Sequence, residues 1–106
     1  MNYSEEDISN ASIKKVAELF NLPYKDILPN YEFGKDLLCD RERSDFKENE
    51  FDLMLFDIRY VADRKTTKEL NSEKLVIRTV NDYCEHMIRS YETNPKRVVD
   101  TLGLSH

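Results

Sequence analysis

The residues of this sequence that could act as nucleophiles or bind a transition metal are two cysteines and two histidines. Cys84 and His86 are two positions apart in a segment with helical periodicity, so their side chains point to different faces of that helix. A catalytic pair needs thiol and imidazole to converge, and no CxxC or HxxxH spacing accompanies these residues. Cys84 lies on the apolar face, where a small core residue is expected. The sequence therefore predicts no catalytic residues and no metal site, and we expect that the protein is not an enzyme.

Acidic side chains gather in the middle of the chain, where Arg41, Arg43 and Lys47 are interleaved with them. Two interpretations stay open. One is a solvated helix face with local ion pairs, each worth only tenths of a kcal/mol. The other is a surface that docks a basic partner protein, because complementary charge speeds association. The residues expected to contact such a partner are Asp40, Asp45, Glu48, Glu50 and Asp52.

Length and composition limit what can position these residues. The chain has 106 residues, which suits one domain, and its net charge of −5 makes binding to nucleic acid unfavourable. No apolar run approaches the roughly 20 residues of a membrane span. The first ten residues carry neither the basic nor the apolar part of a secretory signal. We expect a monomeric, cytoplasmic protein with reduced cysteines.

Apolar residues recur at helical spacing in three long segments. The first spans residues 4–21, with Ser4 as its N-cap. The second spans residues 45–62 and directs Phe51, Met54, Leu55 and Ile58 inward. The third starts near Thr79, which forms a capping box with Asp82, and its apolar rhythm extends to Tyr91.

The remaining segments are shorter or irregular. Residues 22–44 contain two prolines and several large apolar residues, so we expect a long loop packed over the core. Residues 63–74 are polar and are predicted to be a solvated loop with room for one helical turn. The following LVIRTV is rich in β-branched residues but has no evident partner strand. At the C-terminus, Asn94 as N-cap, Pro95 at the first helical position and Gly103 after the end predict a short helix.

These segments predict an all-α fold, a small antiparallel bundle of three main helices with a long packed first loop and short extra helices. The segment VAELFNLPYKDILPNYEFGKDL places Leu22 and Ile27 five apart and then Phe33 before Asp36-Leu37. This spacing resembles the first helix and first loop of acyl carrier proteins. Thr79-Val80 resembles the residues that open the last helix of that family. The resemblance covers about residues 8–90, so we divide the chain into a carrier-like helical domain, 1–93, and a C-terminal extension, 94–106.

The resemblance implies a serine that bears 4′-phosphopantetheine at the start of the second helix. Asp40 matches the Asp of the family's Asp-Ser-Leu motif, but Arg41 stands where the serine is expected. Ser44 follows three residues later. Either the loop is lengthened and Ser44 is the attachment site, or the attachment serine is lost and Ser44 only caps the helix.

Two functions of different class follow from these alternatives. In the first, the protein holds an acyl or peptidyl group as a thioester on 4′-phosphopantetheine and presents it to acyl-transfer or synthase enzymes with basic docking patches. A phosphopantetheinyl transferase would then modify Ser44. In the second, a carrier-like fold without a prosthetic group acts as a protein–protein interaction module. A helical regulator or toxin-system component is a third option, supported only by small size and acidity.

Overall fold

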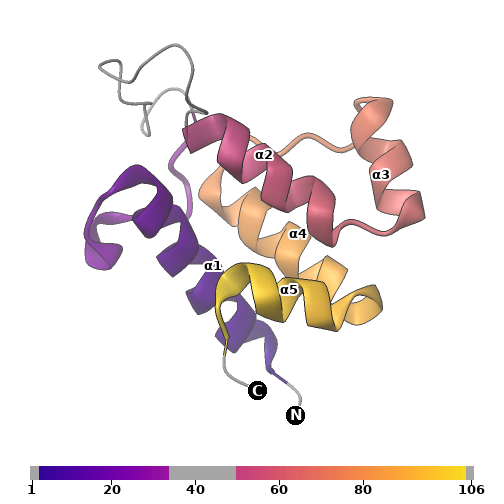
Figure 1. Ribbon diagram of the computed structural model, residues 1–106. Helices are drawn as coiled ribbons and strands as arrows, with labels where there is room; N and C mark the ends of the chain where they lie inside the picture. The colour runs from indigo at the N-terminus through magenta and orange to yellow at the C-terminus, as the bar shows by residue number, and fades with distance from the viewer. Residues whose placement is uncertain (1–2, 34–49, 105–106) are drawn as a thin grey trace.

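The computed structural model of the protein describes residues 3–33 and 50–104, and the regular elements in these ranges are helices (Figure 1). The first, α1 (Glu5–Phe20), begins at a capping box. The amide of Asp7 donates to Ser4 Oγ and the amide of Ser4 donates to Asp7 Oδ2, each at 3.1 Å. α1 ends at Asn21, whose φ of 55° is left-handed. The capping and periodicity predicted for this segment are confirmed.

The central helix is α4 (Val80–Thr93), which packs against α1, α2 (Glu50–Val61) and α5 (Pro95–Leu102). It starts at the predicted capping box of Thr79 and Asp82. Because α4 is covered from several sides, its buried surface is wider than one amphipathic stripe. The core shared by these helices contains Ile8, Val16, Ala17, Ile27, Met54, Ile58, Val61, Val80, Tyr83, Cys84, Met87 and Val98.

The first loop is expected to pack over the core, and its described part, residues 21–33, does so only in part: Leu22 and Leu28 are exposed. It contains one short 3-10 helix, η1 (Tyr24–Asp26), followed by the buried Ile27. The ring of Phe33 stacks on Phe20 at 6.1 Å between centroids. Its amide donates to the carbonyl of Arg78 at 2.9 Å, beside an isolated β-bridge between Glu32 and Thr79. The end of this loop therefore fixes the entry to α4.

The segment after α2 corrects the sequence-based expectation. Residues 63–74 were predicted to be a solvated loop, but they contain α3 (Arg64–Asn71). Asp63 is its N-cap and accepts a hydrogen bond from the amide of Thr66 at 2.7 Å. Thr66 is buried and Leu70, four residues later, packs against the core. This otherwise polar helix therefore contacts the core through a narrow face formed by Thr66 and Leu70.

The predicted C-terminal helix is present as α5, with Pro95 in its first turn and Gly103 in the left-handed conformation that ends it. Val98 and Val99 are buried. Asn94 precedes the helix as predicted, but its side chain makes no capping hydrogen bond and instead donates to the carbonyl of Val61 on α2, at 2.9 Å. Figure 1 shows α5 lying across the other helices, with its end near the start of α1.

The fold is thus all-α in the described residues. Residues 75–79, which include most of the β-branched LVIRTV segment, form no strand beyond the single bridge at Thr79. None of the described helices is long and apolar enough to span a membrane.

Candidate functional site: an apolar cleft beside α2

The sequence-predicted site residues fall at the edge of what the structure describes. Ser44, the candidate attachment serine, lies outside the described residues, as do three of the predicted docking residues, Asp40, Asp45 and Glu48. Glu50 and Asp52 lie in the first turn of α2. Two of the predicted residues are therefore placed on one helix, and the chain enters that helix six residues after Ser44.

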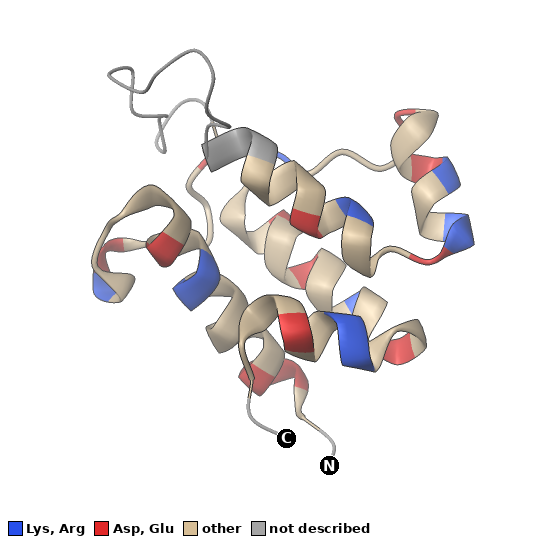
Figure 2. Ribbon diagram, in the orientation of Figure 1, with Lys and Arg blue, Asp and Glu red and all other residues tan. Residues whose placement is uncertain are grey.

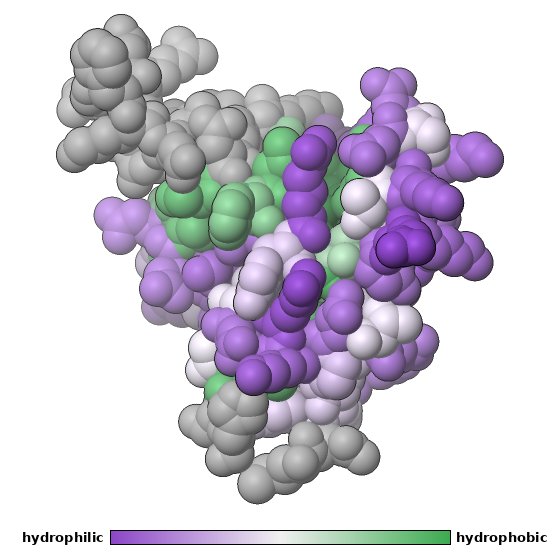
Figure 3. Space-filling view, turned by 45° about the vertical axis from the view of Figure 1, so that its right-hand side comes forward, coloured by the Kyte–Doolittle hydropathy of each residue, from purple (hydrophilic) through white to green (hydrophobic). Residues whose placement is uncertain are grey.

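A cleft of about 560 Å³ runs beside α2 and is bounded on its other side by the segment that connects α3 to α4. We call it the α2 cleft. Most of its lining is apolar: Met54, Leu55, Ile58, Leu70, Leu75, Val76 and Ile77. Figure 3 shows apolar surface gathered between the grey segment and a polar area of the molecule. Clefts of this volume and character are typical of small-molecule sites.

The orientation of α2 about its axis determines which of its residues are buried and which line the cleft, and it corrects the prediction for one residue. Met54 and Ile58 are four residues apart and both are buried, as expected for the inward face. Leu55 was predicted to face inward with them, but it is 45% exposed at the cleft. Phe56, next to it, is 68% exposed. α2 packs on α4 along a narrow strip, so apolar residues flanking this strip stay at the surface.

Charged residues complete the lining of the α2 cleft. Arg59 comes from α2, while Glu73 and Arg78 come from the connection between α3 and α4. Two arginines and one glutamate give the lining a net positive charge, although the whole chain carries −5. Figure 2 shows both basic and acidic positions on α2 and α3 in this part of the molecule. The cleft therefore combines an apolar floor with a cationic border.

Side chains from α4 and α5 hold the C-terminal end of α2, whose last carbonyls have no partner within the helix. His86 Nε2 lies 2.8 Å from the carbonyl oxygen of Ile58. Arg97 Nη1 donates to the carbonyl of Tyr60 at 3.1 Å, and its guanidinium lies over the Tyr60 ring. Asn94 donates to the carbonyl of Val61. The wall of the cleft is thereby fixed to the rest of the molecule.

His86 and Cys84 behave as structural residues of α4. A carbonyl only accepts, so His86 Nε2 carries the proton in its contact with Ile58. Burial is the main reason that the pKa of His86 lies below its ordinary value, and Arg89 lowers this pKa further. Burial also raises the pKa of the Cys84 thiol, whose Sγ lies 3.6 Å from the carbonyl oxygen of Ser9. The prediction that Cys84 is a core residue is confirmed.

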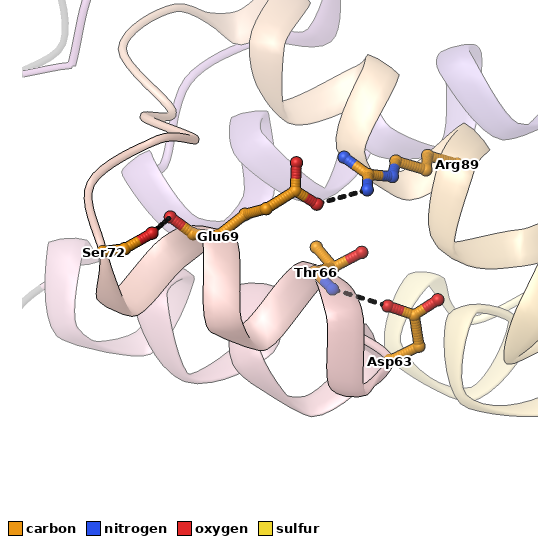
Figure 4. Close-up of polar contacts among 5 residues, drawn as sticks. All are labelled: Asp63, Thr66, Glu69, Ser72 and Arg89. Atoms are coloured by element: carbon orange, nitrogen blue, oxygen red, sulfur yellow. Dashed lines mark hydrogen bonds and ion pairs between the residues drawn. The ribbon is translucent and has the colours of Figure 1, made fainter.

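Polar contacts position α3, which supplies Leu70 to the cleft (Figure 4). Glu69 on α3 forms an ion pair with Arg89 on α4. At the start of α3, the hydrogen bond from the amide of Thr66 is the largest cause of a lowered pKa at Asp63. Ser72 Oγ donates to the carbonyl of Glu69 at 3.3 Å. The ion pair ties α3 to α4, while the contacts of Asp63 and Ser72 stabilise the two ends of α3 itself.

One acidic residue of the central cluster has a structural role. Asp57 Oδ2 lies 4.0 Å from Lys15 Nζ, which links α2 to α1. Partial burial raises the pKa of Asp57, and the nearby Lys15 ammonium counteracts this rise. Asp57 was not among the predicted docking residues, and its ion pair joins two helices rather than neighbours on one helix face.

Comparison with known proteins gives no family assignment: no family model, curated protein or solved structure matches this chain. Within residues 3–33 and 50–104, no three His, Cys, Asp or Glu side chains are grouped so as to hold a metal ion.

Sequence reasoning missed the α2 cleft and the role of His86. The cleft is built from α2 and from residues 70–78, which the sequence does not relate to each other. His86 lies off the apolar stripe of α4, and it is buried where it contacts the carbonyl of Ile58 on α2. In a central helix such as α4, neighbouring helices cover polar residues that the helical periodicity alone would place in solvent.

Proposed function

We propose that the protein is an acyl-carrier-like protein that holds an acyl or peptidyl group as a thioester on 4′-phosphopantetheine attached to Ser44, and presents it to partner enzymes. The observation that carries this proposal is the α2 cleft. It borders the helix that follows Ser44 in the chain, and its lining is mainly apolar. Burying an acyl chain there would gain up to about 0.8 kcal/mol per methylene group.

The order of elements supports the same proposal. The resemblance implies a first helix, a long first loop, a second helix that carries the attachment serine, and a last helix opened by Thr-Val. The chain has α1, a loop, α2, the short α3, and α4 beginning at Thr79-Val80 in that order. The short helix is the element that the polar composition of residues 63–74 had hidden.

The chemistry asks little of the protein itself. A phosphodiester on a serine hydroxyl is favoured at a helix N-terminus, where free amides and the helix dipole attract negative charge. The thioester chemistry then takes place at the end of the prosthetic group, in the sites of partner enzymes. Asp40, Asp45, Glu48, Glu50 and Asp52 would dock basic patches on those enzymes and on the phosphopantetheinyl transferase.

The test is intact-mass spectrometry after incubation with coenzyme A and a phosphopantetheinyl transferase of broad specificity. We expect a gain equal to one phosphopantetheine, lost in Ser44→Ala and retained in the matched control Ser72→Ala, whose serine caps the far end of α3. No mass gain beside a carrier protein that is modified in the same tube would refute the proposal. Modification that persists in Ser44→Ala would refute the assignment of the serine.

A second function is favoured by the exposed apolar side chains of α2. Leu55, Phe56 and Tyr60 are each at least 40% exposed, and exposed aromatic residues of this kind often mark protein contacts. In this alternative the chain is a carrier-like interaction module without a prosthetic group. It predicts that protein isolated from its source has the unmodified mass, and that Phe56→Ser abolishes binding to whichever partner co-purifies with the wild type.

A further inference from the structure

The border of the α2 cleft has cationic groups that take part in no contact of the described residues. Arg89 pairs with Glu69, and Arg97 contacts Tyr60. In contrast, the guanidinium groups of Arg59 and Arg78 have no hydrogen-bond or ion-pair partner within residues 3–33 and 50–104. Both residues are exposed and both line the cleft. Two free guanidinium groups beside an apolar surface are suited to bind a carboxylate.

The apolar part of the cleft is open to a ligand rather than closed by the protein's own side chains. Leu55 on α2 and Val76 on the opposite side are both 45% exposed, while Met54 and Ile58 lie buried beneath. A ligand that covers these side chains removes apolar surface from water on both walls at once. The volume of about 560 Å³ is that of a small-molecule site.

The charge of the lining selects the head group of such a ligand. Glu73 lies in the same cleft as the two arginines, so a site with one net positive charge suits a monoanion better than a polyanion. Glu73 has a φ of 63° in the turn after α3, which places an acidic residue at a tight bend of the chain. A neutral or cationic head group would leave the arginines unneutralised.

We propose that the α2 cleft binds, without covalent attachment, a free monocarboxylate with an unbranched alkyl chain, a ligand of the medium-chain fatty-acid class. The alkyl chain lies against Met54, Leu55, Ile58 and Val76, and the carboxylate contacts Arg59 and Arg78. This binding does not require Ser44. It rests on the same α2 cleft as the proposed function, and it names a free ligand that this cleft would accept.

The experiment is a titration of the full-length ¹⁵N-labelled protein with sodium octanoate, followed by amide chemical shifts. We expect saturable shifts confined to residues 54–59 and 70–78. Butyrate should bind much more weakly, since affinity rises by up to about fourfold per buried methylene group. Octan-1-ol and octylammonium, which have the same chain but a neutral or cationic head, should bind at least tenfold more weakly than octanoate.

Four variants test which side chains of the cleft bind octanoate. Arg59→Gln and Arg78→Gln should each weaken octanoate binding by about threefold to tenfold. The matched control Arg64→Gln removes an exposed arginine of α3 outside the cleft and should leave binding unchanged. Val76→Trp, which fills the mouth of the cleft from an exposed position, should abolish binding while the protein stays folded.

The inference is overturned if octanoate and octan-1-ol bind equally, if Arg64→Gln weakens binding as much as Arg78→Gln does, or if the shifts fall on other helices. It is also overturned if an acidic amphipathic peptide, but not octanoate, perturbs residues 54–59 and 70–78, because the cleft is then a peptide-docking surface. Ser44→Ala must keep octanoate binding. If Ser44→Ala no longer gains the mass of phosphopantetheine but still binds octanoate, attachment at Ser44 and binding in the cleft are shown to be separate properties.

Discussion

His86 is a buried base held between two helices. Its Nε2 donates to the carbonyl of Ile58, and Nδ1 is buried with no hydrogen-bond partner in the described part of the chain. The same holds for the hydroxyls of Tyr83 and Ser90 on α4. A protonated imidazole would place a second donor, and a charge, at a position where no acceptor is available. The neutral form of His86 is therefore the one that fits the fold.

This arrangement makes stability depend on pH. The pKa of His86 is lowered in the folded protein and is about 6.5 in the unfolded chain. On acidification the unfolded chain takes up this proton first, so the free energy of unfolding falls. We expect its contribution to be complete above pH 6.5 and to be lost as pH falls from 6.5 through the lowered pKa. Urea unfolding measured at intervals from pH 8 to pH 5 tests this.

The control is His86→Gln, whose amide keeps a donor for the carbonyl of Ile58 but does not titrate in this range. The difference in unfolding free energy between the two proteins should be constant above pH 6.5 and should shrink below it. This subtraction removes the titration of Asp57, whose raised pKa acts in the opposite direction. A difference that does not vary with pH would show that His86 is not the group responsible.

At the scale of the helices, α3 shows where sequence patterns fail. α1 and α4 were predicted because their signals are local: an N-cap at Ser4 or a capping box at Thr79, followed by a wide apolar face. α3 has only Thr66 and Leu70 on its inner face, and a buried threonine gives no hydrophobic signal. Asp63 three residues before Thr66 was the one local cue, because aspartate is a favourable N-cap. The tertiary contact of Glu69 with Arg89 supplies the rest and is not readable from the sequence.

Asp63, the N-cap of α3, should contribute to the stability of the folded protein. Asp63→Ala removes the acceptor for the amide of Thr66, and we expect a loss of about 1 kcal/mol in unfolding free energy. The loss should become smaller in acid, because the protonated carboxyl keeps an acceptor oxygen but loses its charge. The pKa of Asp63 is lowered when folded, so the cap stabilises above about pH 4, the ordinary carboxyl range, and less as pH falls through the lowered value. Chemical denaturation at pH 7 and pH 2.5 measures both.

Asp63→Asn is the matched control, since asparagine keeps the acceptor without the charge. It should retain most of the stability at pH 7 and show little dependence on acid. If Asp63→Ala is as stable as the wild type at neutral pH, the cap contributes nothing and α3 is held by Thr66 and Leu70 alone.

At the scale of the whole molecule, the features that could not be predicted from the sequence are those formed by segments far apart in the chain. Helical spacing assigns Met54 and Ile58 correctly to the core, but it also assigns Leu55 to the core, and Leu55 is exposed. Leu55 lines the α2 cleft instead. Whether a flanking apolar residue is buried depends on how the neighbouring helices cross, and helical periodicity carries no information on this.

The C-terminal helix α5 bears on where the domain ends. The sequence suggested an extension after residue 93, and this division stays a prediction. The packing of α5 gives it a physical test, because Val98 is fully buried among residues of the other helices. Asn94 and Arg97 also bind the last carbonyls of α2. An element with such contacts is expected to unfold together with the rest of the chain.

We therefore expect Val98→Ala to lower the free energy of unfolding of the entire protein by about 2 kcal/mol, from lost apolar burial and the cavity left behind. Val76→Ala makes the same chemical change at an exposed position and should alter stability by less than about 0.5 kcal/mol. Circular dichroism and the fluorescence of the tyrosines should report one coincident transition in both variants. If Val98→Ala leaves the main transition in place and only a separate, earlier one shifts, α5 is an independent extension, and the anchoring of α2 through Asn94 and Arg97 does not stabilise the fold.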